Sequence, residues 1–327
     1  MEEAMKAIAS VKLEDVATNF PPFMVIYKDG TIQRFLGTQT VAASTDAATG
    51  VESEDVVISP KDEGGVWVRL YKPKDTLQGS KRLPVVIYFH GGAFCVETAA
   101  SPTYHNYLNT LACKANVIVV SVDYRLAPEH PLPAAYEDSW AGVKWVDDGQ
   151  GHQWIRDYAD LSRVFFAGDS AGANISHHMA KRVGKGKEMM NLKLRGILLV
   201  HPYFWGIERI GSEANKIANL PGGGMAERLW EFVCPGTSGA DDPLINPAMD
   251  TELGDLAGEK VMICVAEQDM LRDRGLHYKE ALVKGNCKAS VEVVETLEEN
   301  HVFHLLNPAS ANVVPFMNQV VAFLNSA

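Results

Sequence analysis

A serine in this chain lies between small residues, where an apolar segment meets a segment of helical character. The stretch VFFAGDSAGAN, residues 164–174, places Ser170 in a Gly-x-Ser-x-Gly pattern. When this pattern joins a strand to a helix, the tight turn holds the serine hydroxyl above the end of the strand. The helix N-terminus adds backbone N–H groups that favour developing negative charge. The pattern therefore predicts a nucleophilic serine, although a plain glycine-rich turn has the same spacing.

A second glycine-rich stretch, YFHGGAF at residues 88–94, follows another apolar segment. Glycine lets backbone N–H groups approach a ligand with no Cβ in the way, and such groups stabilise the oxyanion that forms when a nucleophile attacks a carbonyl. We predict that the N–H groups of Gly91, Gly92 and Ala171 form this oxyanion hole, with His90 holding the loop through a hydrogen bond. The alternatives are a simple turn or a phosphate-binding loop, but the Lys-Ser/Thr pair of a phosphate-binding loop does not follow.

A serine hydroxyl is a poor nucleophile without a general base. Among ten histidines, His301 follows the expected strand SVEVVETL, so it lies at the sheet edge that Ser170 is expected to share. Asp269 ends the apolar stretch KVMICVAEQD and lies at the same edge. The order Ser170, Asp269, His301 is the order of nucleophile, acid and base in one large group of serine enzymes. We predict that His301 is the base and that Asp269 orients it.

Other titratable side chains compete for these two roles. The competing histidines follow His301 within one turn, end a strand, or lie on the helix behind the serine: His304, His201, His177 and His178. Asp273 is the main alternative to Asp269 as the acid, and Glu267 is a lesser one. The two histidines on the helix are expected to point away from the sheet edge, so we favour His301.

Short apolar segments, rich in β-branched residues and bounded by turn residues, alternate with helical segments along the chain. The expected strands include 84–90, 116–124, 164–169, 196–204 and 260–269, and the expected helices include 103–115, 134–147, 172–183 and 274–285. Strands that are apolar on both faces belong in a sheet covered by helices on both sides. The alternation predicts an α/β fold with a mostly parallel, doubly wound sheet.

Two regions depart from this alternation. Residues 1–20 have the apolar spacing of an amphipathic helix, and the stretch FMVIYKDGTIQRF is typical of a hairpin that turns at Asp29-Gly30. Residues 205–240 are rich in loops, with helical parts, and are interpreted as an insertion over the C-terminal edge of the sheet. We predict a single domain across the whole chain, with a helical cap built from about 1–40 and 205–240.

The composition argues against several kinds of partner. The chain has 327 residues and a formal net charge of −11, with no Lys/Arg-rich block, so binding to nucleic acid or to a membrane surface is not expected. Its five cysteines lack metal-ligand spacing, and we expect neither a metal nor a cofactor. The N-terminal stretch lacks the apolar core of a signal peptide. Reduced cysteines, with Cys113 and Cys264 expected in the core, favour a cytoplasmic location.

Taken together, the stretches YFHGGAF, SVDYRLAPEHPLPAAYED, GDSAGANISHH and HVFHLL resemble the plant carboxylesterase family, in the hormone-sensitive-lipase branch of the α/β hydrolases. The resemblance runs through nearly the whole chain. It implies an α/β-hydrolase fold and the hydrolysis of small or medium carboxylic esters of plant metabolites through an acyl-enzyme. The chain is also similar to 2-hydroxyisoflavanone dehydratases, whose legume members carry Thr at the position of Ser170.

The resemblance leaves other functions open. Elimination of water from a flavonoid-like substrate, or cyclisation in specialised metabolism, is the main alternative to ester hydrolysis. Related gibberellin receptors bind a small hormone without turnover and lack the histidine that matches His301, which makes a receptor role the weaker alternative.

Several residues near the expected site have two interpretations. The aromatic candidates for the substrate pocket are Phe94, Tyr203 and Trp205, although core packing is an equal expectation for each. Within DYRLAPEHPLPAAYED, Arg125 and Glu129 are expected to form a buried charge pair that supports the fold rather than the chemistry.

Overall fold

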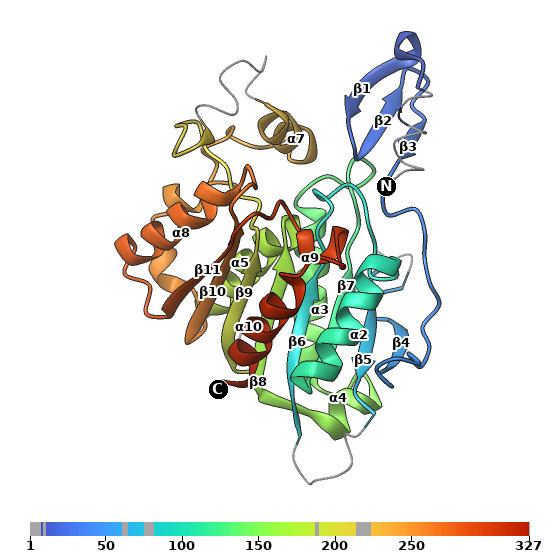
Figure 1. Cartoon of the computed structure of the whole chain (residues 1–327), viewed down its shortest axis with the longest axis vertical. Helices are drawn as coiled ribbons and strands as arrows, with labels where there is room; N and C mark the ends of the chain where they lie inside the picture. The colour runs from blue at the N-terminus through green and yellow to red at the C-terminus, as the bar shows by residue number, and fades with distance from the viewer. Residues whose placement is uncertain are drawn as a thin grey trace.

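One large sheet runs through the centre of the molecule (Figure 1). The structure is a computed structural model and describes residue 8 and residues 11–60, 65–74, 82–186, 190–213 and 224–326. The sheet has eight strands in the order β11-β10-β9-β8-β6-β7-β5-β4. Their bounds are β4 Glu52–Val57, β5 Trp67–Lys72, β6 Leu83–Phe89, β7 Ile118–Asp123, β8 Ala159–Asp169, β9 Leu194–Val200, β10 Lys260–Ala266 and β11 Ser290–Thr296. The six strands β11, β10, β9, β8, β6 and β7 pair in parallel, each with the next in this order. β5 pairs antiparallel with both β7 and β4.

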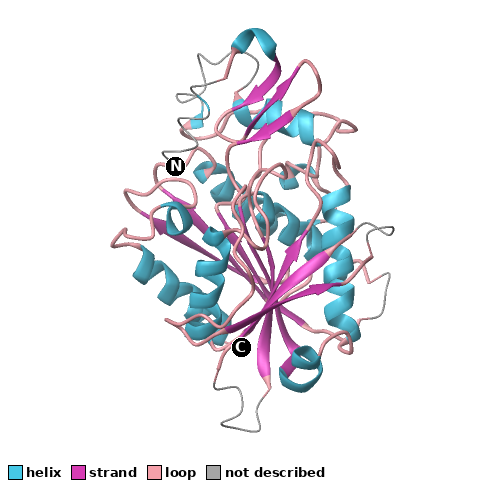
Figure 2. Ribbon diagram, turned by 90° about the vertical axis from the view of Figure 1, so that its right-hand side faces the viewer, coloured by secondary structure: helices cyan, strands magenta, loops and turns pink. Residues whose placement is uncertain are grey.

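Helices cover both faces of this sheet (Figure 2). Their bounds are α2 Pro102–Ala115, α3 Ala134–Asp148, α4 Gln153–Tyr158, α5 Ala171–Gly184, α7 Met225–Val233, α8 Arg272–Lys284, α9 Phe303–Leu306 and α10 Val313–Asn325. One apolar core packs α3, α5 and α8 against the sheet, and a second packs α2 and α10. Every residue of β6 is therefore buried. The prediction of a mostly parallel α/β fold is confirmed.

A smaller sheet of three strands, in the order β1-β2-β3, lies at one end of the molecule near α7 (Figure 1). Its strands are β1 Val16–Phe20, β2 Met24–Tyr27 and β3 Ile32–Arg34. The hairpin predicted here is confirmed, and the N–H of Thr31 donates to Asp29 Oδ1 (2.8 Å) at its turn. The helix expected over residues 1–20 is wrong for its last part, because residues 16–20 form β1, which pairs antiparallel with β2 and whose residues alternate between more and less exposed positions. Most of residues 1–10, and residues 214–223 of the second expected cap segment, lie outside the described residues.

Two smaller expectations are wrong. Arg125 pairs with Asp138 (Nη2 to Oδ1, 2.8 Å) and not with Glu129, because the intervening segment is a turn and α3 brings Asp138 back to Arg125. Glu129 instead pairs with Arg34 of β3 (2.5 Å). Cys113 is exposed rather than in the core, since it lies on the side of α2 that faces solvent.

The turn from β8 into α5 brings backbone segments very close together. A Cβ atom on Gly172 would lie 1.9 Å from the carbonyl oxygen of Phe89, at the end of β6, and one on Gly168 would lie 2.4 Å from the backbone of Gly172. No other residue type fits at such distances. Between these glycines Ser170 has φ 51° and ψ −116°, a backbone conformation that is uncommon for residues other than glycine.

We predict that Gly172→Ala lowers the free energy of unfolding by at least about 2 kcal/mol, because the added methyl group overpacks a rigid backbone contact. The measurement is the denaturation midpoint in urea. Gly236→Ala is the matched control, since a Cβ at this exposed turn has no atom within 4 Å, and its effect should stay within about 0.5 kcal/mol. Equal midpoints for the two variants would contradict the close approach of α5 to β6.

Candidate active site

The backbone of Ser170 is tied to a neighbouring strand as well as to its own helix. Its N–H donates to the carbonyl of Val200 at the end of β9 (2.9 Å). Its carbonyl accepts the N–H groups of Tyr203 (3.0 Å) and Ala173 (3.1 Å). These bonds on both sides of the residue keep the strained turn in place, and the side chain lines a cavity.

Three side chains from distant parts of the chain meet at this turn. His301 Nε2 lies 3.0 Å from Ser170 Oγ, and Nδ1 of the same ring lies 2.7 Å from Asp269 Oδ2. Asp269 follows β10 and His301 follows β11. Because parallel strands end at the same edge of a sheet, both side chains reach the end of β8, where ligands bind in folds of this kind.

Charge and burial act in opposite directions on this pair. The Asp269 side chain is 1% exposed. Burial alone would raise its pKa, but the charge and hydrogen bond of His301 bring the pKa of Asp269 below its usual value. Burial would lower the pKa of His301, yet the Asp269 carboxylate raises it above the usual value. With Asp269 ionised and bound to Nδ1–H, a neutral His301 presents Nε2 to Ser170 as a proton acceptor.

His201 is not a competing base but holds the backbone next to His301, a role that the sequence pattern does not predict. Its Nδ1 accepts the N–H of Val302 (2.7 Å), which has a left-handed φ of 46° next to His301. Burial lowers the pKa of His201 to about 3, so the ring stays neutral and can accept this bond. His201, Asp269 and His301 also have potential metal-ligand atoms within 4.8 Å of one another. One nitrogen of each imidazole already has a hydrogen-bond partner, since His201 Nδ1 bonds to Val302 and His301 Nδ1 bonds to Asp269. The sequence feature that pointed to His201 was its position directly after the expected strand that becomes β9.

The other competing residues have partners away from the serine. Asp273 accepts hydrogen bonds from the N–H and hydroxyl of Ser212 (2.6 and 2.7 Å). Glu267 accepts a backbone N–H from the loop after β11 (2.8 Å). The remaining histidines bond to or pack against other parts of the core: His177, His178 and His304.

The structure corrects the role predicted for Gly91. Its N–H donates to the hydroxyl of Tyr104 (2.8 Å) and to Asp169 Oδ1 (3.2 Å), so it is used inside the protein. Tyr104 lies on α2 and Asp169 ends β8. The sequence pattern around the glycines contains neither partner, which is why the direction of this N–H could not be predicted.

The next two peptide groups of the loop, Gly91–Gly92 and Gly92–Ala93, have their carbonyls and not their N–H groups bonded inside the protein. The carbonyl oxygen of Gly91 lies 2.8 Å from His90 Nδ1, and the carbonyl of Gly92 accepts two N–H groups from later in the loop (2.9 and 3.0 Å). In a trans peptide the N–H points opposite to the C=O. The N–H groups of Gly92 and Ala93 therefore point away from these partners, and among the described residues neither has an acceptor. Ala93 lines the cavity that Ser170 lines.

A cavity of about 360 Å³ opens over Ser170 and His301. Its apolar wall comes from the small sheet, α7 and the loop after β10: Phe23, Met225, Ala226, Leu229, Met270 and Leu271. Such a wall favours an apolar part of a ligand next to the serine hydroxyl.

The three aromatic residues expected in this pocket have different positions. Tyr203 lines the cavity, but Phe94 and Trp205 do not. Trp205 is 0% exposed, and the guanidinium groups of Arg209 and Arg274 pack against its ring, each 5.3 Å from the ring centroid. Phe94 is 1% exposed and belongs to the core of the sheet. The expectation that Phe94 and Trp205 line the pocket is therefore corrected.

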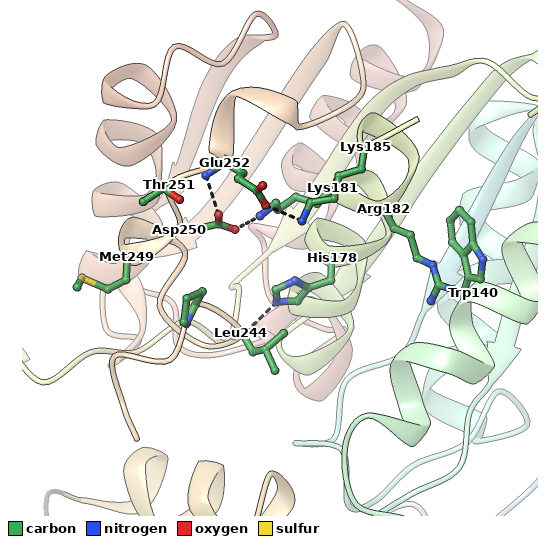
Figure 3. A pocket seen from close by; sticks show the side chains of 11 residues that line it. Trp140, His178, Lys181, Arg182, Lys185, Leu244, Met249, Asp250, Thr251 and Glu252 are labelled. Carbon is green, nitrogen blue, oxygen red and sulfur yellow. Dashed lines mark hydrogen bonds and ion pairs between the residues drawn. The ribbon is translucent and has the colours of Figure 1, made fainter. Parts of the chain in front are cut away.

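A larger hollow of about 670 Å³ lies beside the C-terminal half of α5 (Figure 3). Four of its charged side chains pair with one another, Lys181 with Asp250 and Lys185 with Glu252, and Arg182 pairs with Glu137 outside the hollow. Ser170 is not among the residues that line it. With its charges paired and with none of Ser170, Asp269 and His301 in its lining, this hollow is not part of the candidate active site.

Comparisons with known proteins identify the fold and the family of this chain. A family model described as alpha/beta hydrolase fold matches residues 86–305. The chain is 45% identical over 314 residues to Probable carboxylesterase 2 of Arabidopsis thaliana, covering 95% of this chain and 97% of that protein. It is 42% identical over 317 residues to Tuliposide A-converting enzyme 1, chloroplastic, of Tulipa gesneriana, covering 95% and 78%. Esterase LipW from Mycobacterium marinum, a solved structure, matches with a TM-score of 0.71 and 28% identity, covering 85% and 82%.

The expected cytoplasmic location is wrong. The enzyme from Tulipa gesneriana is named as chloroplastic, and Probable carboxylesterase 4 of Arabidopsis thaliana, 42% identical over 329 residues (98% of this chain and 86% of that protein), is named as mitochondrial. Cysteines without disulfides distinguish reducing from oxidising surroundings, but they do not select one compartment. In the part of the chain that the structure describes, no helix is both long enough and apolar enough to span a membrane.

Proposed function

This chain belongs to the α/β-hydrolase fold family and is a serine carboxylesterase, and we propose that Ser170, His301 and Asp269 form its catalytic triad. The observation that carries the proposal is the pair of contacts from Ser170 Oγ to His301 Nε2 (3.0 Å) and from His301 Nδ1 to Asp269 Oδ2 (2.7 Å). A neutral imidazole with this geometry can remove the hydroxyl proton as the oxygen attacks a carbonyl carbon.

The triad would act in two steps through an acyl-enzyme. Ser170 Oγ attacks the ester carbonyl while His301 takes its proton, and the tetrahedral intermediate expels the alcohol, which receives that proton. Water then attacks the acyl group as His301 removes a proton from it. The carboxylic acid leaves and Ser170 regains its hydrogen. In both steps Asp269 orients the imidazole and stabilises its charged form.

We assign the oxyanion hole to the N–H groups of Gly92, Ala93 and Ala171. The support for Gly92 and Ala93 is the orientation of their peptide groups, whose carbonyls are held on the opposite side. Ala171 is the first residue of α5, so its N–H lies at the positive end of the helix dipole. Ala93 follows the two glycines of the loop and has a left-handed φ of 56°.

The proposed substrate is a small or medium ester of a plant specialised metabolite. A cavity of about 360 Å³ with a mainly apolar wall suits such a molecule, including a flavonoid-like ester. The name of the relative from Tulipa gesneriana supports a metabolite as the substrate. These relatives favour ester hydrolysis over elimination of water, and they give no support to a receptor role.

We also propose that the small sheet and α7 together cap the cavity in one continuous domain. Phe23 between β1 and β2, and Met225 and Leu229 of α7, line the cavity. The ring of Phe20 on β1 lies 4.8 Å from that of Phe232 on α7. Two segments about 200 residues apart thus contact each other above the serine.

The first test is Ser170→Ala assayed on p-nitrophenyl acetate. Turnover should fall at least about 1,000-fold, because no other group replaces the nucleophile. An organophosphate should label the wild-type protein at Ser170 and leave the variant unlabelled. Ser162→Ala, at the opposite and exposed end of β8, is the control and should retain wild-type turnover. Retained turnover in Ser170→Ala, with the fold intact by circular dichroism, would remove Ser170 from the role.

The pH dependence tests the acid and the base. Because Asp269 raises the pKa of His301 above its usual value of about 6.5, kcat/KM should already fall as the pH drops through neutrality. Asp269→Asn removes that carboxylate, so the acid limb should move to lower pH and kcat should fall about 10,000-fold. Asp273→Asn, the competing acid, should leave the limb in place. An acid limb that moves in Asp273→Asn and not in Asp269→Asn would reverse the assignment.

The cap predicts a dependence on substrate size. Phe23→Ala should lower kcat/KM about 10-fold for a p-nitrophenyl ester with a six-carbon or aromatic acyl group, because a buried Phe side chain contributes about 1.5–3 kcal/mol of apolar contact. The acetate ester, which is too short to need this contact, should change much less. Tyr27→Phe, which removes a hydroxyl bonded to Gln33 in the same sheet, is the control. An equal loss for short and long esters would contradict a cap role.

A further inference from the structure

The buried groups around the loop of residues 90–96 determine where its N–H groups point. We propose that Asp169 and Tyr104 are positioning residues that direct the Gly92 N–H toward the substrate oxyanion. The inference rests on the proposed function, since it presupposes that Ser170 is the nucleophile. Neither residue lines the cavity, so both act through the backbone of the loop.

The first step is the bond that holds the start of the loop. The Tyr104 hydroxyl accepts the N–H of Gly91 (2.8 Å) and donates to Asp169 Oδ2 (3.0 Å). Asp169 Oδ1 lies 3.2 Å from the same Gly91 nitrogen. The Gly91 N–H is thereby held by the Tyr104 hydroxyl and by the Asp169 carboxylate, which also accepts a hydrogen bond from that hydroxyl.

The second step fixes the other side of the same residue. The hydroxyl of Tyr124 donates to the carbonyl of His90 (2.6 Å) and lies 3.2 Å from that of Gly91. The Tyr124 ring stacks on the His90 imidazole, with centroids 4.2 Å apart and planes 11° apart. The Nδ1–H of His90 donates to the carbonyl of Gly91 (2.8 Å). Because peptide groups are planar, fixing this carbonyl and the N–H before it leaves one direction for the N–H of Gly92.

The third step places this arrangement next to the nucleophile. Asp169 directly precedes Ser170, and β8 pairs with β6, which leads into the loop. A Cβ on Gly91 would lie 2.3 Å from Asp169 Oδ2, so the loop and the carboxylate are in the closest contact that glycine allows. The same short segment thus supplies both the attacking oxygen and the anchor of the oxyanion loop.

Burial explains why this anchor needs several partners. Asp169 is 1% exposed, and burial raises its pKa to about 6. The hydroxyl of Tyr88 donates to Oδ1 (2.8 Å) and that of Tyr104 to Oδ2. A buried carboxyl group is costly unless it is hydrogen-bonded. Its position against the loop, and away from the cavity, indicates that its bonds serve orientation rather than substrate contact.

The test begins with Tyr104→Phe, which removes the bridging hydroxyl and keeps the ring. We expect kcat on p-nitrophenyl acetate to fall about 10- to 100-fold with KM within about threefold, since the lost interaction is made in the transition state. Tyr107→Phe is the matched control on the same helix. Its hydroxyl is buried without a hydrogen-bond partner among the described residues, so kcat should stay at the wild-type value.

A pair of inhibitors separates positioning from general damage. The Ser170 hydroxyl adds to the carbonyl carbon of a trifluoromethyl ketone and passes its proton to His301, which leaves an oxyanion, whereas the matching methyl ketone stays an uncharged ground-state analogue. In Tyr104→Phe the Ki of the trifluoromethyl ketone should rise by the factor by which kcat/KM falls, and the Ki of the methyl ketone should not change. Equal rises for both ketones, or a lower Tm with unchanged kcat, would overturn the inference.

Variants of Asp169 give an independent result if Tyr104→Phe does not fold. Asp169→Asn keeps an oxygen that accepts the N–H of Gly91, and Asp169→Ala has none. Asn should retain kcat within about tenfold and Ala should lose at least about 100-fold, with folding checked by circular dichroism. Equal activities of the two folded variants would overturn the inference.

These results are distinguishable from a failure of the proposed function. An inactive Ser170→Ala protein together with a fully active Tyr104→Phe protein would overturn the positioning role alone. An active Ser170→Ala protein would overturn the triad, and the positioning inference with it.

Discussion

The whole site depends on the contact between the start of α5 and the end of β6. The Cβ that Gly172 lacks would lie 1.9 Å from the Phe89 carbonyl oxygen, so the two backbones touch. The strand that ends at Phe89 leads into the loop of residues 90–96, to which we assign the oxyanion hole, and the helix begins directly after Ser170. A close backbone contact therefore fixes the distance between Ser170 and the loop after β6, while side-chain hydrogen bonds set the direction of the N–H groups of that loop.

Around this contact, a carboxylate partner rather than burial distinguishes His301, the proposed base, from the other histidines. Burial lowers the pKa of His90 to about 4 and that of His201 to about 3, and both rings hold backbone groups while neutral. His301 is set apart by Asp269, which raises its pKa despite the burial. Three histidines at one sheet edge thus have different tasks because their nearest charges differ.

The parts of the site that could be predicted from the sequence are those fixed by the ends of strands. Ser170, Asp269 and His301 each follow a parallel strand, and such strands all end at the same edge, so strand order and a short motif are enough to bring them together. The direction of a single peptide group is different, because it depends on hydrogen bonds from remote elements. The N–H of Gly91 is taken by Tyr104 from a helix that the loop sequence does not specify. Partners from remote elements also decide that Arg125 pairs with Asp138, and that the rings of Phe94 and Trp205 lie in the core and not in the cavity.

The position of Phe94 follows from the strain in the loop that carries it. Ala93 and Phe94 have φ values of 56° and 61°, and the left-handed conformation costs about 1–2 kcal/mol for each non-glycine residue. Burying a phenylalanine side chain contributes about 1.5–3 kcal/mol, which is of the same size as the combined strain. The Phe94 ring is fully inside the core, and its carbonyl accepts the N–H of Ala127 (2.8 Å). A ring turned into the pocket would leave the strain uncompensated. Phe94 therefore stabilises the shape of the loop, and the cavity wall is left to Tyr203 and to the residues of the proposed cap.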